Sequence, residues 1–283
     1  MIARLSLCLL MVLLPAARLR AAPDPEQPAI APGDQVIKLF NGRDMTGLYT
    51  WLRETQYEDP KHVFTVHDGL LHISGDGYGY VTTKQAYKDY RLIAEFRWGT
   101  RTWGTRKDRT KDSGILVHCV GPDGNNGNWM ASIEAQIIEG GVGDLLVVGG
   151  KYSDGSAVPV SLTCELRTDP QGNIFKDAMG VYWKKGGPRK TFPAGRINWY
   201  GRDPGWKDVL GFRGKNDVES PDGQWTRMEV ICDGGHVRVI VNGVPVNEGF
   251  DAFPSAGKII FQTELAEIFF RKIELWPLPS KGK

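Results

Sequence analysis

The stretch TRMEVICDGGHVRVIVNGVPV, residues 226–246, decides the fold. Apolar and polar residues alternate on both sides of the Asp-Gly-Gly at 233–235, which is the pattern of two β-strands joined by a tight turn. Asn242 and Gly243 supply a second turn, because both residue types tolerate the positive φ that such turns require. The stretch therefore predicts three consecutive antiparallel strands.

The same alternation recurs over most of the chain after residue 35. No amphipathic helical pattern of useful length competes with it, and the turn sequence HDG at 67–69 again separates two strand-like runs. So many short strands predict an all-β fold, a β-sandwich or jelly roll of two antiparallel sheets with long loops. The main runs are 36–40, 62–66, 70–74, 90–98, 113–120, 226–232, 236–243 and 257–276.

The first residues have the pattern of a cleaved secretory signal: a basic start, an apolar run that ends at Leu14, and small residues before a Pro-rich stretch. The run is shorter than the roughly 20 residues that span a bilayer, and a retained anchor is the alternative. We therefore expect a secreted or periplasmic protein. The expected organisation is a signal peptide at 1–22, a linker at 23–34 and one domain at 35–279 with a loop-rich insert at about 149–223.

Loss of residues 1–22 would remove three arginines and no acidic residue, so the net charge would change from +2 to −1. A nearly neutral chain with nine Trp and nine Tyr suits a protein that handles neutral ligands, and we expect no nucleic-acid or membrane partner. Three cysteines remain, and two of them lie in strand patterns where a thiol is a small apolar residue. We expect no structural disulfide among Cys119, Cys164 and Cys232.

Polar residues occupy one side of the strand SIEAQIIE, residues 132–139. Alternation places Glu134 and Gln136 on one face of this strand and its isoleucines and alanine mainly on the other. A bulge at the two adjacent isoleucines would bring Glu139 round to the same face as Glu134.

Two further strands carry polar residues in the same way. Glu95 and Arg97 share one face of the run at 90–98, and His118 lies opposite the apolar residues of the run at 113–120. If these strands are neighbours of 132–139, all the polar residues form one patch on the concave side of a curved sheet. Carboxylates set among Arg and His suit acid/base chemistry on a glycosidic bond. The alternative is an ordinary wet face, with Glu95 and Arg97 a surface pair contributing below about 1 kcal/mol.

Loop residues suggest how a sugar could be held. Trp103 and Trp129 lie in loops and are candidates to stack on sugar rings, although tryptophans also anchor loops by burial. The loop GPDGNNGN at 121–128 contains Asp123 and Asn125 but lacks the downstream glutamate of a calcium loop. We expect no cofactor, with a divalent metal such as calcium as the alternative.

Six motifs in order resemble the 3-keto-disaccharide hydrolase domain family, and together they cover nearly the whole chain after the signal. The resemblance implies a concanavalin A-like jelly-roll sandwich related to lectins and laminarinase-type glucanases. It also implies action on glycosides whose sugar has been oxidised to a ketone at C3. The motifs are 39–51, 64–98, 112–118, 133–139, 223–248 and 257–278.

The resemblance also assigns residues. The family's Glu-x-Gln pattern falls on Glu134 and Gln136, its Glu-x-Arg pattern on Glu95 and Arg97, and its late glutamine on Gln262.

The chain departs from the family pattern at three positions. Asp112 stands where the family often has Asn, His118 where it often has Arg, and Glu264 where it often has His. Gln136 also replaces the central acid of the ExDxxE motif that EAQIIE resembles in retaining glucanases. Loss of that acid disfavours ordinary double displacement and leaves the preferred substrate open.

These residues give a mechanistic hypothesis. A ketone at C3 makes the C2 proton acidic, so we expect Glu134 to remove it while Arg97 or His118 stabilises the enolate oxygen. The C1 substituent then leaves and water adds, and Glu95 and Glu139 are the next candidates for the base. The substrate would be an oligosaccharide or another glycoside. The alternatives are a non-catalytic carbohydrate-binding module and ordinary glycoside hydrolysis.

Overall fold

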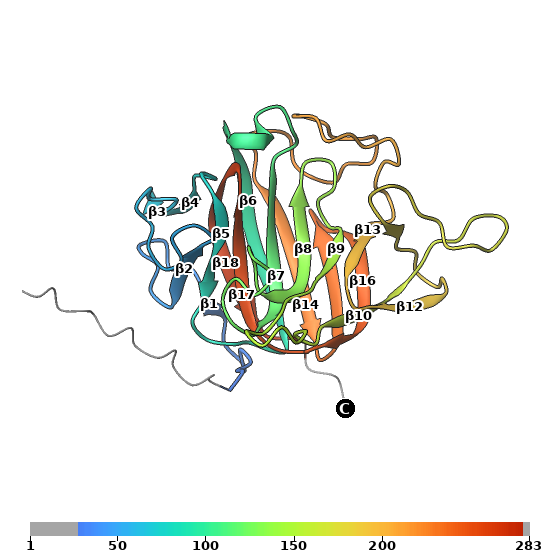
Figure 1. The fold of residues 1–283 in the computed structure, drawn as a ribbon, viewed down its shortest axis with the longest axis horizontal. Coiled ribbons are helices and arrows are strands. Elements are labelled where there is room, and N and C mark those ends of the chain that lie inside the picture. Colours follow the sequence, from blue (N-terminus) through green and yellow to red (C-terminus); the bar gives the residue numbers. More distant parts are fainter. Residues whose placement is uncertain (1–27, 280–283) are drawn as a thin grey trace, which may run out of the picture.

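The computed structural model describes residues 28–279, which form two β-sheets packed face to face (Figure 1). The predicted signal at 1–22 lies outside these residues. The all-β jelly-roll prediction is confirmed, since the one helical element in the described range is a single 3₁₀ turn, η1 (Gly104–Arg106). In that range no helix is long and apolar enough to cross a membrane.

The larger sheet has ten strands, with β6 near its centre between β14 and β18. In order across the sheet they are β12 (Arg189–Phe192), β10 (Ser161–Glu165), β16 (Val244–Phe253), β15 (His236–Val241), β14 (Thr226–Asp233), β6 (Tyr90–Thr102), β18 (Ala266–Trp276), β4 (Leu70–Ile73) and β3 (Phe64–His67), and β1 (Ile37–Lys38) also pairs with β18.

The smaller sheet has eight strands. Its pairs are antiparallel except β11 with β13, so the prediction of purely antiparallel sheets is wrong for that pair. The order is β11 (Val181–Tyr182), β13 (Gly195–Asn198), β9 (Leu145–Val148), β8 (Ala131–Ile138), β7 (Asp112–Val120), β17 (Lys258–Glu264), β5 (Tyr78–Thr83) and β2 (Leu48–Leu52).

The turns predicted from Gly, Asn and Asp form as expected. Asn242 and Gly243, between β15 and β16, have φ of 48° and 83°. Asp68 and Gly69, between β3 and β4, have φ of 53° and 74°. Positive φ at both central residues belongs to the hairpin turn whose twist matches that of its strands, which explains why these pairs of residues fix the register.

Alternation along each strand divides the residues between the core and the outer faces. Ile133, Ala135 and Ile137 of β8 point into the core between the sheets, where they join the inward residues of β6. The outward side of β8 carries Glu134 and Gln136, as predicted. The outer face of the eight-stranded sheet also carries a second, smaller apolar cluster. Its members are Trp51, Tyr80, Leu116, Cys119, Trp129, Met130, Val148 and Ile260.

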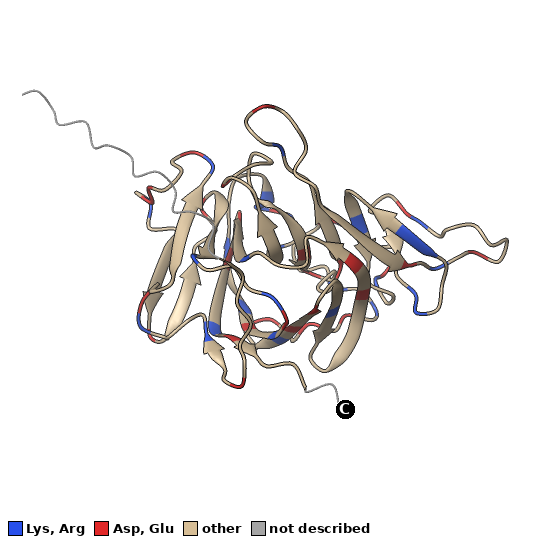
Figure 2. Ribbon diagram, turned by 90° about the horizontal axis from the view of Figure 1, so that it is seen from below, with Lys and Arg blue, Asp and Glu red and all other residues tan. Residues whose placement is uncertain are grey.

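The segment 149–223, predicted from the sequence as a loop-rich insert, contains four short strands, β10 to β13. β10 and β12 extend the ten-stranded sheet, whereas β11 and β13 extend the other sheet. The part around β12 projects from the side of the sandwich (Figure 1). Acidic and basic residues are interspersed over the described chain in the view of Figure 2.

Candidate active site

Three of the predicted polar residues meet on the outer face of the eight-stranded sheet. Glu134 and Gln136 lie on β8, Gln262 lies on β17, and β7 runs between these two strands. Glu134, Gln136 and Gln262 are only 3%, 3% and 1% exposed. Burial of three polar side chains on an outward face is unusual and needs a physical or functional reason.

Gly114 of β7 forms the floor between them. It is the cross-strand partner of Gln136. A β-carbon on residue 114 would lie 2.4 Å from Oε1 of Glu134 and 2.4 Å from Oε1 of Gln262. Such contacts are far below van der Waals separation, so only glycine lets the carboxyl and the amide converge over β7.

The Glu134 carboxyl is held in a form that can exchange a proton near neutral pH. Burial raises the pKa of Glu134 to about 8, with the charge of Asp112 acting in the same direction and Arg196 opposing it. Desolvation disfavours the charged form of a carboxyl group, which is the physical cause of the rise. A carboxyl with a pKa near the working pH is suited to general acid–base catalysis.

The amide of Gln262 lies against the Glu134 carboxyl and interacts with it, which opposes the rise of the Glu134 pKa. Its Nε2 and Oε1 are buried, and neither forms a hydrogen bond of ordinary geometry within the described residues. A buried amide without a partner costs about 1–3 kcal/mol. A substrate oxygen or hydroxyl that entered beside Glu134 would remove this cost.

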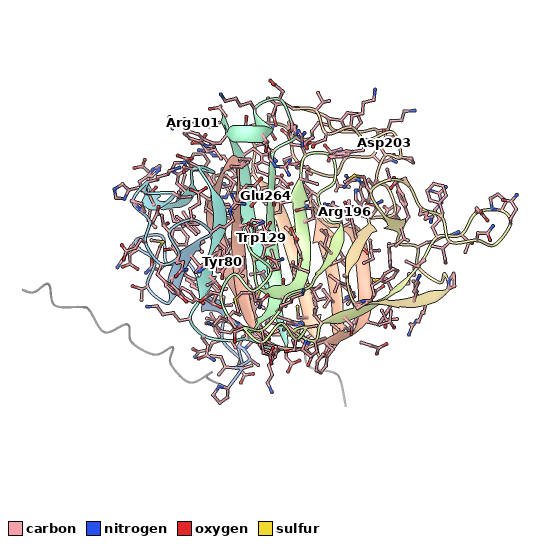
Figure 3. The ribbon with its side chains drawn as sticks, in the orientation of Figure 1. Tyr80, Arg101, Trp129, Arg196, Asp203 and Glu264 are labelled. Carbon is pink, nitrogen blue, oxygen red and sulfur yellow. The ribbon has the colours of Figure 1, made fainter. Side chains whose placement is uncertain are left out.

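A second group of charges borders Glu134. Arg106, at the end of η1, forms an ion pair with Asp112 of β7, and its Nη2 lies 3.4 Å from Oε1 of Glu264 at the end of β17. Burial raises the pKa of Asp112 to about 6 against the charge of Arg106. Burial and the charge of Asp112 raise the pKa of Glu264 well above its usual range. In Figure 3, Glu264 lies over the strands of the eight-stranded sheet, above Trp129 and Tyr80.

A buried ionic cluster lies on the other side of Glu134. The Asp144 carboxylate accepts hydrogen bonds from Nη1 of Arg196, at 2.8 Å, from Arg202, and from the backbone N–H of Trp199, at 2.8 Å. Asp144 and Arg202 have no exposed side-chain surface. The cluster holds Arg196 of β13 beside Glu134, to the right of Glu264 in Figure 3.

Sequence reasoning missed most of these charged neighbours. Alternation could have found two of them, because Glu264 lies two residues after Gln262 and Asp112 two residues before Gly114. Both were noted only as departures from a family pattern. Nothing local in the sequence indicates that Arg106 or Arg196 reaches this face.

The prediction that Glu95 and Arg97 join Glu134 is wrong. Both lie on β6, which belongs to the ten-stranded sheet, and they face outward from it. Glu95 accepts a hydrogen bond from Nε of Arg271 at 2.6 Å. The Arg97 guanidinium lies 4.9 Å from the ring centre of Trp225. These residues form the surface pairs of the alternative interpretation.

The placement of His118 on this face is also wrong. The pairing of β7 with β8 shifts between Val117 and Val120, and His118 has a φ of 55°. This bulge turns Cys119, rather than His118, toward the outer apolar cluster. His118 is fully buried, and burial lowers its pKa to about 4. Its neutral ring cannot serve as a charged enolate stabiliser.

The Glu139 carboxylate is bound by backbone N–H groups of the protein and, contrary to the prediction from the sequence, does not join Glu134 on its face. The register of β7 with β8 is regular at Ile137 and Ile138, so the expected bulge is absent there. Oε2 of Glu139 accepts the N–H groups of Lys111, at 2.9 Å, and Gly211, at 3.1 Å. Glu139 therefore fastens the loop around residue 211 to the end of β8.

Trp103 and Trp129, the two residues predicted to stack on sugar rings, both make contacts within the protein. Nε1 of Trp103 donates a hydrogen bond to the backbone oxygen of Ser74 at 2.8 Å. Trp129 belongs to the outer apolar cluster, edge-on to Tyr78 at 6.3 Å between ring centres. Trp129 is 9% exposed, so its role is mainly to anchor a loop.

The loop that was considered for calcium is anchored by tyrosines. The Asp123 carboxylate accepts hydrogen bonds from the hydroxyls of Tyr49, at 2.8 Å, Tyr57, at 3.0 Å, and Tyr80, at 2.7 Å. Burial and the charge of Asp123 raise the pKa of Tyr49 and of Tyr80, so both hydroxyls remain donors. Within residues 28–279 no three His, Cys, Asp or Glu side chains are grouped to hold a metal ion.

We expect Asp123→Ala to lower the free energy of unfolding by about 2 kcal/mol, because three tyrosine hydroxyls lose their acceptor together. Urea denaturation measures the change. Asp154→Ala is the control, since Asp154 is exposed and bonds only within its own turn, to Ser156. Equal stability of the two variants would contradict an anchoring role for Asp123.

The family of the chain follows from a comparison with known protein families. The family model of the 3-keto-alpha-glucoside-1,2-lyase-like domain matches residues 35–275. The chain belongs to this family. The family match and the resemblance in the sequence agree, and they support a carbohydrate-active protein. No curated protein sequence matches the chain.

Solved structures of similar outline are distant. A provisionally assigned glycosyl hydrolase from Parabacteroides distasonis is 17% identical, with a TM-score of 0.49, over 86% of this chain and 94% of that one. A carbohydrate-binding module from Bacillus subtilis is 8% identical, with a TM-score of 0.42, over 81% and 94%. A Bacillus licheniformis beta-glucanase is 10% identical, with a TM-score of 0.40, over 86% and 97%.

Proposed function

We propose that this chain cleaves glycosides whose sugar carries a ketone at C3. The observation that carries the proposal is the Glu134 carboxyl held beside the buried amide of Gln262 over Gly114. A carboxyl group that ionises near neutral pH and a buried amide donor beside it are the groups that proton removal next to a carbonyl needs. The family to which the chain belongs supports a 3-keto sugar as the substrate.

In the proposed reaction, Glu134 takes the proton from C2 of the sugar. The electron pair of the C–H bond moves into an enolate whose oxygen, at C3, accepts a hydrogen bond from Nε2 of Gln262. Arg196 adds a positive charge beside Glu134. The enolate then collapses, the C1–O bond breaks with its electron pair on the departing oxygen of the aglycone, and the sugar ring becomes a C1–C2 unsaturated ketone. Gln262 and Arg196 thus take the role that the sequence suggested for Arg97 or His118.

Addition of water completes the reaction as a hydrolysis. Water attacks C1 of the unsaturated ketone, C2 recovers its proton from Glu134, and the proton that the water loses balances the one that the departing oxygen takes to become an alcohol. The sum is one glycoside plus one water giving an alcohol and a free 3-keto sugar, with no change of oxidation state. The amide of Gln136 cannot exchange a proton at neutral pH, so its role is confined to orientation.

The test is a comparison of oxidised with ordinary sugars. Purified protein is incubated with 3-keto-trehalose or 3-keto-lactose and, separately, with trehalose or lactose, and release of free sugar is measured. Cleavage of the oxidised sugars alone supports the proposal. Cleavage of ordinary sugars would favour conventional glycoside hydrolysis, and binding without cleavage would indicate a binding module.

The rate should increase with pH up to about 8. Because burial raises the pKa of Glu134 to about 8, from an ordinary value of 4.5, the ionised form that accepts the C2 proton increases as the pH rises through 8. We therefore expect kcat/KM to rise about tenfold per pH unit on the acid side of this value. A pH–rate profile between 5 and 9 on a 3-keto disaccharide measures it. A profile that is flat from pH 5 upward would mean that an ordinary, solvated carboxylate is the base.

A further inference from the structure

We propose that Glu264 protonates the departing glycosidic oxygen, as the acid partner of the base Glu134. This inference rests on the proposed function and adds a second catalytic group to it. Three observations support this role: the position of Glu264 in the sheet, the charges around it and its access to solvent.

The strand geometry places Glu264 on the reacting face but away from the base. On β17 it lies two residues beyond Gln262, so the two side chains share a face. The antiparallel register pairs it with Tyr78 on β5, while Arg106 links it to Asp112 on β7. Ile260 of β17 and Glu134 of β8 both pair with Leu116 of β7, so Gln262 lies two residues, and Glu264 four residues, further along the sheet than Glu134.

The local charge favours a proton on Glu264. Asp112, Glu264 and Asp208 all lie within ion-pair distance of the single guanidinium of Arg106, and Asp112 makes the closest contact. A second carboxylate that shares a counter-charge is the one that keeps its proton. Burial and Asp112 raise the pKa of Glu264 well above its usual range. A carboxyl group that keeps its proton, on the same face as a carboxyl base, is the arrangement that acid–base catalysis requires.

Solvent access distinguishes the two ends of the site. Glu264 is partly exposed, whereas Glu134 is buried. A sugar whose C2 lies against Glu134 would direct its aglycone toward the more open end, where Glu264 is. The leaving group can then take its proton and diffuse away without passing the base.

The proton balance closes over one cycle. As the C1–O bond breaks, the oxygen takes the proton of Glu264 and leaves as an alcohol, which makes Glu264 a carboxylate. The water that then attacks C1 returns a proton to Glu264, and Glu134 returns its proton to C2. Both carboxyl groups end in the state in which they began.

The experiment varies the leaving group. A 4-nitrophenoxide leaves without a proton, whereas a methoxide does not, so an acid matters only for the second. For Glu264→Gln we expect kcat on a methyl 3-keto-glucoside to fall about 10²-fold. On the 4-nitrophenyl 3-keto-glucoside it should fall less than about threefold. Exchange of the C2 hydrogen in D₂O should continue, because Glu134 is intact.

The controls separate the possible failures. Glu95→Gln makes the same chemical change on the other sheet and should alter neither rate. Equal loss on both glucosides, or no loss on either, would overturn the role of Glu264 while leaving the proposed function in place. A wild-type protein that cleaves neither 3-keto-glucoside would overturn both proposals. Thermal unfolding of Glu264→Gln should match that of the wild type within a few degrees, since glutamine has the shape of the protonated acid.

Discussion

Replacing Glu134 with glutamine is expected to lower kcat on a 3-keto disaccharide by about 10³-fold, within the range usually lost with a general base. Glutamine keeps the shape of the side chain over Gly114 but cannot accept a proton from C2. KM should change little, because the proposed contacts of the substrate with Gln262, Gln136 and Arg196 do not involve the changed group. Steady-state kinetics on the purified variant measure both constants.

The matched control for this variant is Glu219→Gln. Burial raises the pKa of Glu219 to about 8, as for Glu134, but Glu219 accepts a hydrogen bond from Trp98 of the ten-stranded sheet. It therefore tests whether loss of any buried, weakly acidic carboxyl group impairs the enzyme. Retained activity in Glu219→Gln together with loss in Glu134→Gln locates the effect at the proposed base.

Isotopic substitution provides a second measurement on the same reaction. Deuterium at C2 should slow the wild-type enzyme if proton removal limits the rate, or exchange with solvent if it does not. Direct displacement at C1 predicts neither result. Full activity of Glu134→Gln on a verified 3-keto substrate would contradict the assignment of the base.

The sequence predicted the faces of the strands but not their neighbours. Alternation placed Glu134 and Gln136 opposite Ile133 and Ile137 correctly, because that choice depends on side-chain period alone. The same rule placed Glu95 correctly on an outward face. It could not show that β6 pairs with β14 and β18, in the other sheet, because strand order depends on contacts distant in sequence.

Single-residue irregularities explain another error. His118 follows the alternation of its strand until a bulge at Val117, where one extra residue reverses the faces. The bulge leaves no local mark in SGILVHCV, since His tolerates positive φ and Cys is apolar. A sequence pattern of period two therefore fails wherever the ladder gains one residue.

The charged neighbours of Glu134 were beyond the reach of local patterns for a different reason. Arg106 comes from a loop after β6, and Arg196 from a short strand within a segment whose sequence did not indicate one. Each is positioned by a carboxylate partner, Asp112 or Asp144, rather than by its own strand. Such partners become visible only when the sheet has been assembled.

Gly114→Ala is the substitution that should separate activity from stability. The added methyl group would meet only the ends of two side chains, Oε1 of Glu134 and Oε1 of Gln262, and these can move. We expect the free energy of unfolding to change by about 1 kcal/mol, at the low end of overpacking costs. Displacement of the base by about 1 Å from its productive position should nevertheless lower kcat about 10²-fold.

Gly149→Ala is the control, because a β-carbon there has no atom within 4 Å. Its activity and stability should match the wild type. If Gly114→Ala is fully active, the convergence of Glu134 and Gln262 over β7 is not what makes the site work. If it is inactive but folded, with the urea midpoint nearly unchanged, the loss lies in the geometry of the carboxyl and the amide. The restriction to glycine at residue 114 then follows from the chemistry on this face of the sheet, since the fold alone would accept alanine.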